Sequence, residues 1–163
     1  MRESLQTAPR RAPDLLVARH ARPEDAEQIA LLSAPFVEQG QLVARSLTEL
    51  AAMSQDFVVA CEGDRLVGCA GLAPCGDSLV IYNLCIAADR QGRGIGRDLV
   101  GIAETIAGEL GRGSLLALTR HGGEWFGKLG FHEVPASGIR EEWRPLFRPG
   151  RRSSLYRLTL TSE

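Results

Sequence analysis

The chain has 163 residues, of which 44% are hydrophobic and 24% charged, and its formal net charge is −1. This length and apolar content are typical of one globular domain and exclude a largely disordered chain. The balanced charge gives no overall attraction to nucleic acid or to an anionic membrane, and no apolar run approaches the length of a membrane span.

The N-terminal stretch, residues 1–14, has basic residues and two prolines but no apolar run behind them. We expect a frayed tail rather than a signal peptide, which places a single domain at residues 15–163 and the protein in the cytoplasm. The four cysteines form no CxxC pair and are expected to be reduced and mostly buried. Neither they nor the three histidines have metal-ligand spacing, so no metal site is predicted.

The apolar pattern predicts the first elements in chain order. A strand at 15–21 precedes a helical pattern that opens at Pro23 and continues to a break near Gly40, and a second, short helix follows at 47–53. Residues 57–75 are two apolar runs around a Gly-Asp turn, which predicts a β-hairpin. Residues 78–88 are apolar nearly throughout, as expected of a central strand covered on both faces.

The remaining elements alternate between helix and strand. Apolar residues at helical spacing predict a helix at 98–110, and SLLALT predicts a buried strand at 114–119. A short helix in GGEWFGKLGF would end at Gly130, before strands at 131–135 and 153–160. The predicted fold class is α/β, with a mixed central β-sheet flanked by helices and without internal repeats.

The stretch DRQGRGIGRDLV, residues 89–100, lies between the predicted central strand and a helix. Glycines before a helix N-terminus expose backbone N–H groups, and the helix adds partial positive charge, so a phosphate or diphosphate is the natural ligand. A Walker A loop is excluded because Arg97 and Asp98 follow Gly96, and the spacing G-R-G-I-G does not fit the dinucleotide fingerprint G-x-G-x-x-G. It does fit Q-x-x-G-x-G.

The run LCIAADRQGRGIGRDLV resembles the acetyl-CoA-binding motif of the GNAT N-acetyltransferases, and WFGKLGF resembles a segment near the end of that fold. The resemblance covers about residues 15 to 160 and implies the GNAT (acyl-CoA N-acyltransferase) fold, with acetyl-CoA as co-substrate. It implies that strand 79–87 splays from strand 114–119, and that a backbone amide there polarises the thioester carbonyl. It implies these coenzyme-binding residues: Leu84, Cys85 and Ile86 for the pantetheine arm, and Gln91, Gly92, Arg93, Gly94, Ile95, Gly96 and Arg97 for the diphosphate.

Three stretches resemble the acetyltransferase domain of the bacterial N-acetylglutamate synthases: LSAPFVEQGQLVARS, the run from Leu118 to Phe131, and PLFRPGRRSSLYRLTL. This resemblance implies that Arg45, Arg151 and Ser153 contact substrate carboxylates, with Arg144 as a further candidate. Guanidinium groups suit a dicarboxylate because they bind each carboxylate bidentately. A second interpretation of Arg45 is a solvated helix arginine.

The catalytic positions depart from the family pattern. The tyrosine that many GNAT enzymes place before the last Gly-Phe is Phe126 here, and the glutamate proposed as general base is Val80. Thr119 matches a family Ser/Thr that serves the leaving thiolate. With Val80 in place of that glutamate, Tyr82 and a bound water are the remaining candidates for the general base.

Other residues have simpler interpretations. Trp125 and Phe126 are expected in the core, the Cys85 thiol is expected to be incidental, and His121 is expected to be an exposed loop residue rather than a proton shuttle. Tyr82 lies in an apolar strand, so a role in packing rather than in catalysis is a second interpretation of this residue. The arginine cluster near the C-terminus has no aromatic stacking platform, which disfavours a nucleic-acid patch.

The sequence therefore predicts direct acetyl transfer, in a ternary complex, to the α-amine of an amino acid. Glutamate is the first candidate for the acceptor, and the resemblance then implies a role in arginine biosynthesis. The alternatives are a GNAT enzyme for another small amine or a protein, and a non-catalytic acyl-CoA-binding sensor. Membrane and nucleic-acid partners are not expected, and a homodimer is an analogy from the fold alone. The kinase-like domain through which many such synthases sense arginine has no counterpart in these residues, so feedback by that route is not expected.

Overall fold

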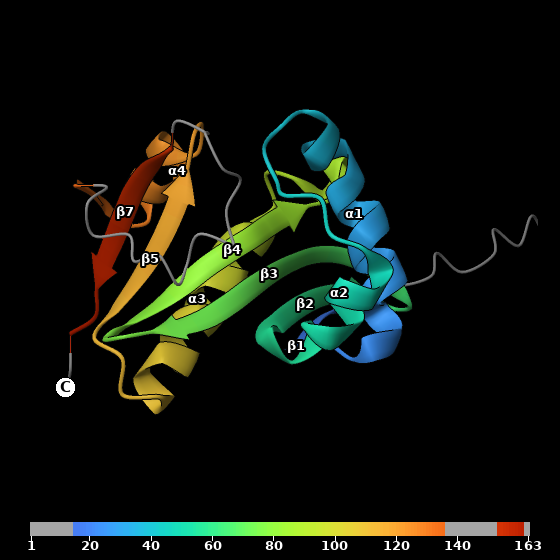
Figure 1. Ribbon diagram of the computed structural model, residues 1–163, viewed down its shortest axis with the longest axis horizontal. Coiled ribbons are helices and arrows are strands. Elements are labelled where there is room, and N and C mark those ends of the chain that lie inside the picture. The colour runs from blue at the N-terminus through green and yellow to red at the C-terminus, as the bar shows by residue number, and fades with distance from the viewer. Residues whose placement is uncertain (1–14, 136–152, 162–163) are drawn as a thin grey trace, which may run out of the picture.

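The computed structural model describes residues 15–135 and 153–161 as an α/β arrangement around one mixed sheet (Figure 1). The strands are β1 (Leu16–His20), β2 (Phe57–Glu62), β3 (Arg65–Cys75), β4 (Ser78–Ile86), β5 (Ser114–Thr119), β6 (His132–Val134) and β7 (Ser154–Thr159). The helices are α1 (Ala26–Glu38), α2 (Leu47–Ala52), α3 (Ile95–Glu109) and α4 (Gly123–Lys128), with 3-10 turns η1 (Pro23–Asp25), η2 (Ser54–Asp56) and η3 (Ala88–Arg90). The predicted order of elements is confirmed.

The sheet has the strand order β1-β2-β3-β4-β5-β7-β6. The β4–β5 pair is parallel, and the other neighbouring pairs are antiparallel. A parallel connection needs a crossover, and α3 supplies it between β4 and β5. As predicted, β4 is the central strand.

Helices cover both faces of the sheet. In Figure 1, α1 and α2 lie on the near face and α3 lies behind the sheet. Alternate residues of the strands divide between these two layers. On the α3 face, the fully buried residues include Val67, Leu79, Leu99 and Leu115. On the α1 face, they include Ile29, Phe57, Val59 and Cys69.

The first helical segment begins as the turn η1 and then runs as α1 through Pro35 to Glu38. Proline removes one backbone donor but does not always end a helix, and α1 ends just before Gly40, whose φ is +73°. The predicted break near Gly40 is confirmed. Helix α2 begins at a capping box, in which the Ser46 side chain and the Glu49 backbone are paired.

The start of α1 is fixed by a buried carboxylate. Asp25 accepts hydrogen bonds from Arg19 Nη1 and Nη2 at 2.7 and 3.0 Å and from the Arg22 backbone N–H at 2.7 Å. The Arg19 guanidinium, more than the Arg22 amide, lowers the pKa of Asp25 below its ordinary value. No helix among the described residues is long and apolar enough to cross a membrane.

Candidate active site

Strands β4 and β5 separate partway along their length. They pair only from Ser78 with Ser114 to Ile81 with Ala117, although β4 continues to Ile86 and β5 to Thr119. Toward the top of Figure 1 their ribbons diverge. This bears out the splay that the family resemblance implied. Beyond Ile81, backbone groups on the β5 side of β4 are therefore available to an extended ligand.

The glycine loop follows β4 and η3 and leads into α3. Gly92 and Gly94 have φ values of +78° and +83°, a left-handed conformation that side chains with a Cβ rarely adopt. A Cβ on either residue would meet no atom within 4 Å, so the space above the loop is open. Helix α3 begins at Ile95, three residues earlier than predicted, so Gly96 lies in its first turn. The N–H groups of that turn have no acceptor within the helix and can bind an anion.

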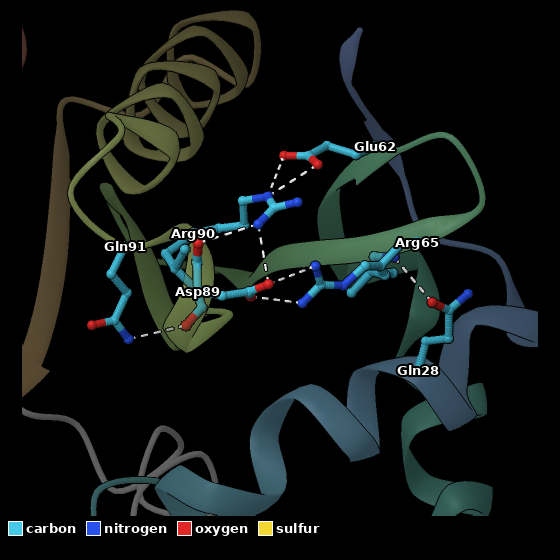
Figure 2. Close-up of polar contacts among 8 residues, drawn as sticks. Gln28, Glu62, Arg65, Asp89, Arg90 and Gln91 are labelled. Atoms are coloured by element: carbon cyan, nitrogen blue, oxygen red, sulfur yellow. Dashed lines mark hydrogen bonds and ion pairs between the residues drawn. The ribbon is translucent and has the colours of Figure 1, made fainter. Parts of the chain in front are cut away.

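A network of ion pairs holds the segment just before the loop (Figure 2). Arg90 Nε donates to both carboxylate oxygens of Glu62 at 2.8 and 3.0 Å, and its Nη1 reaches Asp89 at 3.1 Å. Arg65 forms a bidentate pair with Asp89 at 2.9 and 2.7 Å. Hydrogen bonding to Arg65 lowers the pKa of Asp89 to about 2, so the pair stays ionised at neutral pH. Gln91 Nε2 also donates to the Ile86 carbonyl at 3.1 Å, which ties the loop to the end of β4.

A cleft of about 590 Å³ runs from the separated strands to the glycine loop. All the predicted coenzyme residues except Arg93 line it; Arg93 is an exposed residue of the same loop. Both predicted catalytic residues, Tyr82 and Thr119, line it as well. The described residues contain no group of three or more His, Cys, Asp or Glu side chains that could hold a metal ion.

Tyr82 lies on the wall that faces α1 and α2. Only 3% of it is exposed; its ring meets Phe57 edge-on at 5.6 Å and covers Gly71, where a Cβ would lie 2.5 Å from ring carbons. Burial, with the Asp56 carboxylate as a second cause, raises the pKa of Tyr82. Its hydroxyl is therefore protonated at neutral pH and is not a base in that state.

Thr119 lies at the end of β5 on the opposite wall. Its Oγ1 accepts a hydrogen bond from the Gly122 backbone N–H at 2.8 Å. A hydroxyl that accepts in this way keeps its own proton to donate. The position therefore suits donation to a group in the cleft.

Trp125 corrects one sequence prediction. Phe126 is buried in the core as expected, but 38% of Trp125 is exposed and its ring lines the cleft. The indole lies against Gly96, where a Cβ would be 2.9 Å from Cζ2. The sequence held a signal for this, because adjacent helical residues point in directions about 100° apart and cannot both face one core. His121 is exposed, as predicted, and also lines the cleft.

Arg45 lies in the loop before α2 rather than on a solvated helix face. Its guanidinium carbon is 5.4 Å from the centre of the Tyr82 ring, within cation–π range. It lines a second cavity of about 270 Å³ that shares Asn83 with the cleft. Ser153 directly precedes β7 and is half-buried. The two other predicted carboxylate-binding residues, Arg144 and Arg151, lie outside the described residues.

Val80, at the position of the family glutamate, is 1% exposed and packs with Leu116 and Leu155. No carboxylate therefore occupies that position. The sequence prediction also missed Asn83, whose φ is +51°. Asparagine in an apolar strand is a recognisable irregularity, but its conformation could not be inferred from the sequence.

Comparison with known proteins agrees with this geometry. The acetyltransferase (GNAT) domain model matches residues 53–133. The amino-acid acetyltransferase of Pseudomonas putida strain GB-1 is 32% identical over 142 residues, which cover 86% of this chain and 31% of that protein. An uncharacterized N-acetyltransferase of Chlorobaculum tepidum is 30% identical over 128 residues, which cover 77% of this chain and 82% of that protein.

Among solved structures, the N-acetylglutamate synthase of Neisseria gonorrhoeae, in complex with coenzyme A and N-acetyl-glutamate, superposes with a TM-score of 0.83 at 28% identity. The match covers 91% of this chain and 36% of that one. The chain thus spans about a third of the length of the amino-acid acetyltransferases that it matches. By its fold, its glycine loop and these relatives, the chain belongs to the GNAT family of acetyltransferases.

Proposed function

We propose that the chain transfers the acetyl group of acetyl-CoA to the α-amine of L-glutamate, the reaction of arginine biosynthesis that yields N-acetylglutamate. The observation that carries this proposal is the likeness, over 91% of the chain, to a synthase whose complex contains coenzyme A and N-acetyl-glutamate. The acceptor is part of the proposal because this chain matches only 31% of the length of the amino-acid acetyltransferase of Pseudomonas putida.

The coenzyme is assigned to the cleft. Its diphosphate would accept hydrogen bonds from the backbone between Gln91 and Gly96, with the positive end of α3 behind it. Arg93 and Arg97 are exposed beside this position and add positive charge. The pantetheine arm would pair with β4 at Leu84–Ile86, where the pairing with β5 has ended.

The acceptor is assigned to the side of the cleft that faces α1. There Arg45 is held over the Tyr82 ring beside the second cavity, and its guanidinium can bind a carboxylate bidentately. Ser153, Arg144 and Arg151 are proposed as further contacts to the two carboxylates. These assignments follow the resemblance to the synthases.

The chemistry needs a neutral amine. Its nitrogen attacks the thioester carbonyl carbon, a C–N bond forms, the C–S bond breaks and the amine loses a proton. We assign that proton to water, because Val80 has no titratable group and the raised pKa of Tyr82 keeps its hydroxyl protonated. The leaving thiolate takes a proton from the Thr119 hydroxyl, which solvent replaces.

One observation favours a second acceptor class. The buried Val80 removes the carboxylate that the family resemblance assigns to the general base. An amine that is already neutral at working pH would not need it. A small amine of lower pKa than the α-amine of glutamate is therefore the alternative acceptor.

The experiment is to follow thiol release from acetyl-CoA with each of the amino acids and with polyamines, and to identify the product by mass spectrometry. Release with glutamate alone supports the proposal. Release with another amine assigns that amine instead, and coenzyme binding without turnover refutes acetyl transfer by this chain in favour of an acyl-CoA sensor.

Variants then test the acceptor site. Arg45→Gln should raise the KM for glutamate by about tenfold or more while leaving the KM for acetyl-CoA nearly unchanged, because removal of a charge-assisted hydrogen bond costs about 1.5–3 kcal/mol. Arg151→Gln tests the second contact in the same way. Arg157→Gln is the matched control, since Arg157 is an exposed residue of β7. Equal effects on both KM values would contradict the assignment.

A further inference from the structure

Asn83 has an unusual backbone. Its φ of +51° is the one positive value among the described residues other than glycine. The pairing of β3 with β4 shifts at this point: Gly71 pairs with Tyr82, but Cys69 pairs with Cys85, so β4 contains one extra residue. Such a bulge breaks the alternation of side chains. Tyr82 and Cys85 consequently both face the layer of α1 and α2.

The Asn83 side chain is held from α1. Its Nδ2 donates to Ser33 Oγ at 3.2 Å, and both residues are buried, with 8% and 6% exposed. The Ser33 hydroxyl also lies 3.8 Å from Cys85 Sγ, and the backbone carbonyl of Asn83 accepts a hydrogen bond from Cys69 Sγ at 3.6 Å. Most of the buried residues in this layer are apolar. Buried polar groups in such a layer define one arrangement, because any other leaves them without partners.

The position of this contact connects two sites. Asn83 lines both the cleft and the cavity that contains Arg45, and α1 contributes Ser33 and Val37 to the wall of that cavity. Asn83 also lies two residues after Ile81, the last residue of β4 that pairs with β5, and it directly precedes Leu84. The β4 backbone proposed to pair with the pantetheine arm is thus held, at the residue just before it, by a hydrogen bond that Asn83 donates to α1.

We propose that the Ser33–Asn83 hydrogen bond is a positioning device for acetyl transfer: it fixes the bulge of β4 against α1, so that the backbone at the thioester and the acceptor cavity keep one relative geometry. This rests on the proposed reaction in the cleft, although not on which amine is the acceptor. Ser33 and Asn83 act through the position of the backbone and do not react. Their loss should therefore lower kcat far more than it weakens coenzyme binding, because the diphosphate contacts of the glycine loop remain.

The test compares Ser33→Ala, Asn83→Gly and the double variant with the wild-type chain. Glycine tolerates the positive φ, so Asn83→Gly removes the side-chain contact without imposing strain. Each single variant should lower kcat about tenfold or more, since a misplacement of about 1 Å between reacting groups can cost about a hundredfold. The Kd for coenzyme A, measured by calorimetry, should change by less than about twofold, and the double variant should be no slower than the slower single one.

Ser114→Ala is the matched control. Ser114 and Ser78 share a buried hydroxyl contact of 2.6 Å at the far end of the β4–β5 pairing. Its loss should reduce thermal stability comparably and leave kcat unchanged. Wild-type kcat in Ser33→Ala or Asn83→Gly, additive losses in the double variant, or an equal loss in Ser114→Ala would each overturn the proposal. If the wild-type chain binds coenzyme A in calorimetry but acetylates no amine, the proposed function is wrong. That outcome differs from failure of the positioning proposal, in which the wild-type chain is active and the variants are equally active.

Discussion

The substitution Gly94→Ala tests the proposed diphosphate loop most directly. Gly94 is the residue before α3, its φ is +83°, and a Cβ there would meet no atom within 4 Å. The effect of the new methyl group is therefore confined to the backbone conformation. No packing loss complicates its interpretation.

The magnitude follows from that conformation. A left-handed backbone costs a residue with a Cβ about 1–2 kcal/mol relative to glycine. Because the loop is exposed and its open side has no contacts, we expect the free protein to relax and the cost to appear on binding. The Kd for coenzyme A should then rise about 5- to 30-fold.

Calorimetry with coenzyme A and with ADP measures the effect. Both ligands carry a diphosphate, so both should lose the same factor. Gly101→Ala is the matched control, because Gly101 is an exposed residue inside α3 with open space around it. It should gain about 0.5–1 kcal/mol of stability and bind normally. Wild-type affinity in Gly94→Ala, or a loss for coenzyme A but not for ADP, would refute the reasoning.

Three further predictions follow from the described contacts. Leu99→Ala should lower the free energy of unfolding by about 2–5 kcal/mol in urea, because Leu99 is only 1% exposed; a smaller loss would contradict its place in the core. The stability that Asp25 contributes is complete above the ordinary pKa of 3.8 and is lost as the pH falls through its lowered folded pKa, so Asp25→Asn should flatten the acid limb of a plot of stability against pH. Gly96→Ala should displace the exposed Trp125 ring, raising the KM for acetyl-CoA with a stability loss below about 1 kcal/mol; an unchanged KM would show that the ring does not contribute.

Much of the fold could be predicted because its signals are local. The hairpin of β2 and β3 follows from two apolar runs around Gly63, which has a φ of +57°, and the central place of β4 follows from its nearly continuous apolar sequence. The glycine loop was equally visible, since its spacing excludes other phosphate loops. These features depend on residues near one another in the chain.

The rest depends on contacts between distant segments. The outward position of Trp125 depends on Gly96, which leaves room for the indole, and the half-buried state of Arg45 depends on Tyr82. The Asn83 side chain, at the bulge, donates a hydrogen bond to a serine fifty residues earlier in the chain. Such pairings are set by tertiary packing, which outweighs local preference.

The short parallel pairing of β4 with β5 has a mechanical consequence. Among the described residues, four residue pairs join β4 to β5 across the cleft, while α3 contacts β2, β3, β4 and β5. Helix α3 therefore packs against strands on both sides of the cleft and connects the two parts of the sheet. The proposed diphosphate site lies at the N-terminus of this helix. Coenzyme binding should then slow amide hydrogen exchange in β2 and β5 together, although the two strands lie on opposite sides of the ligand.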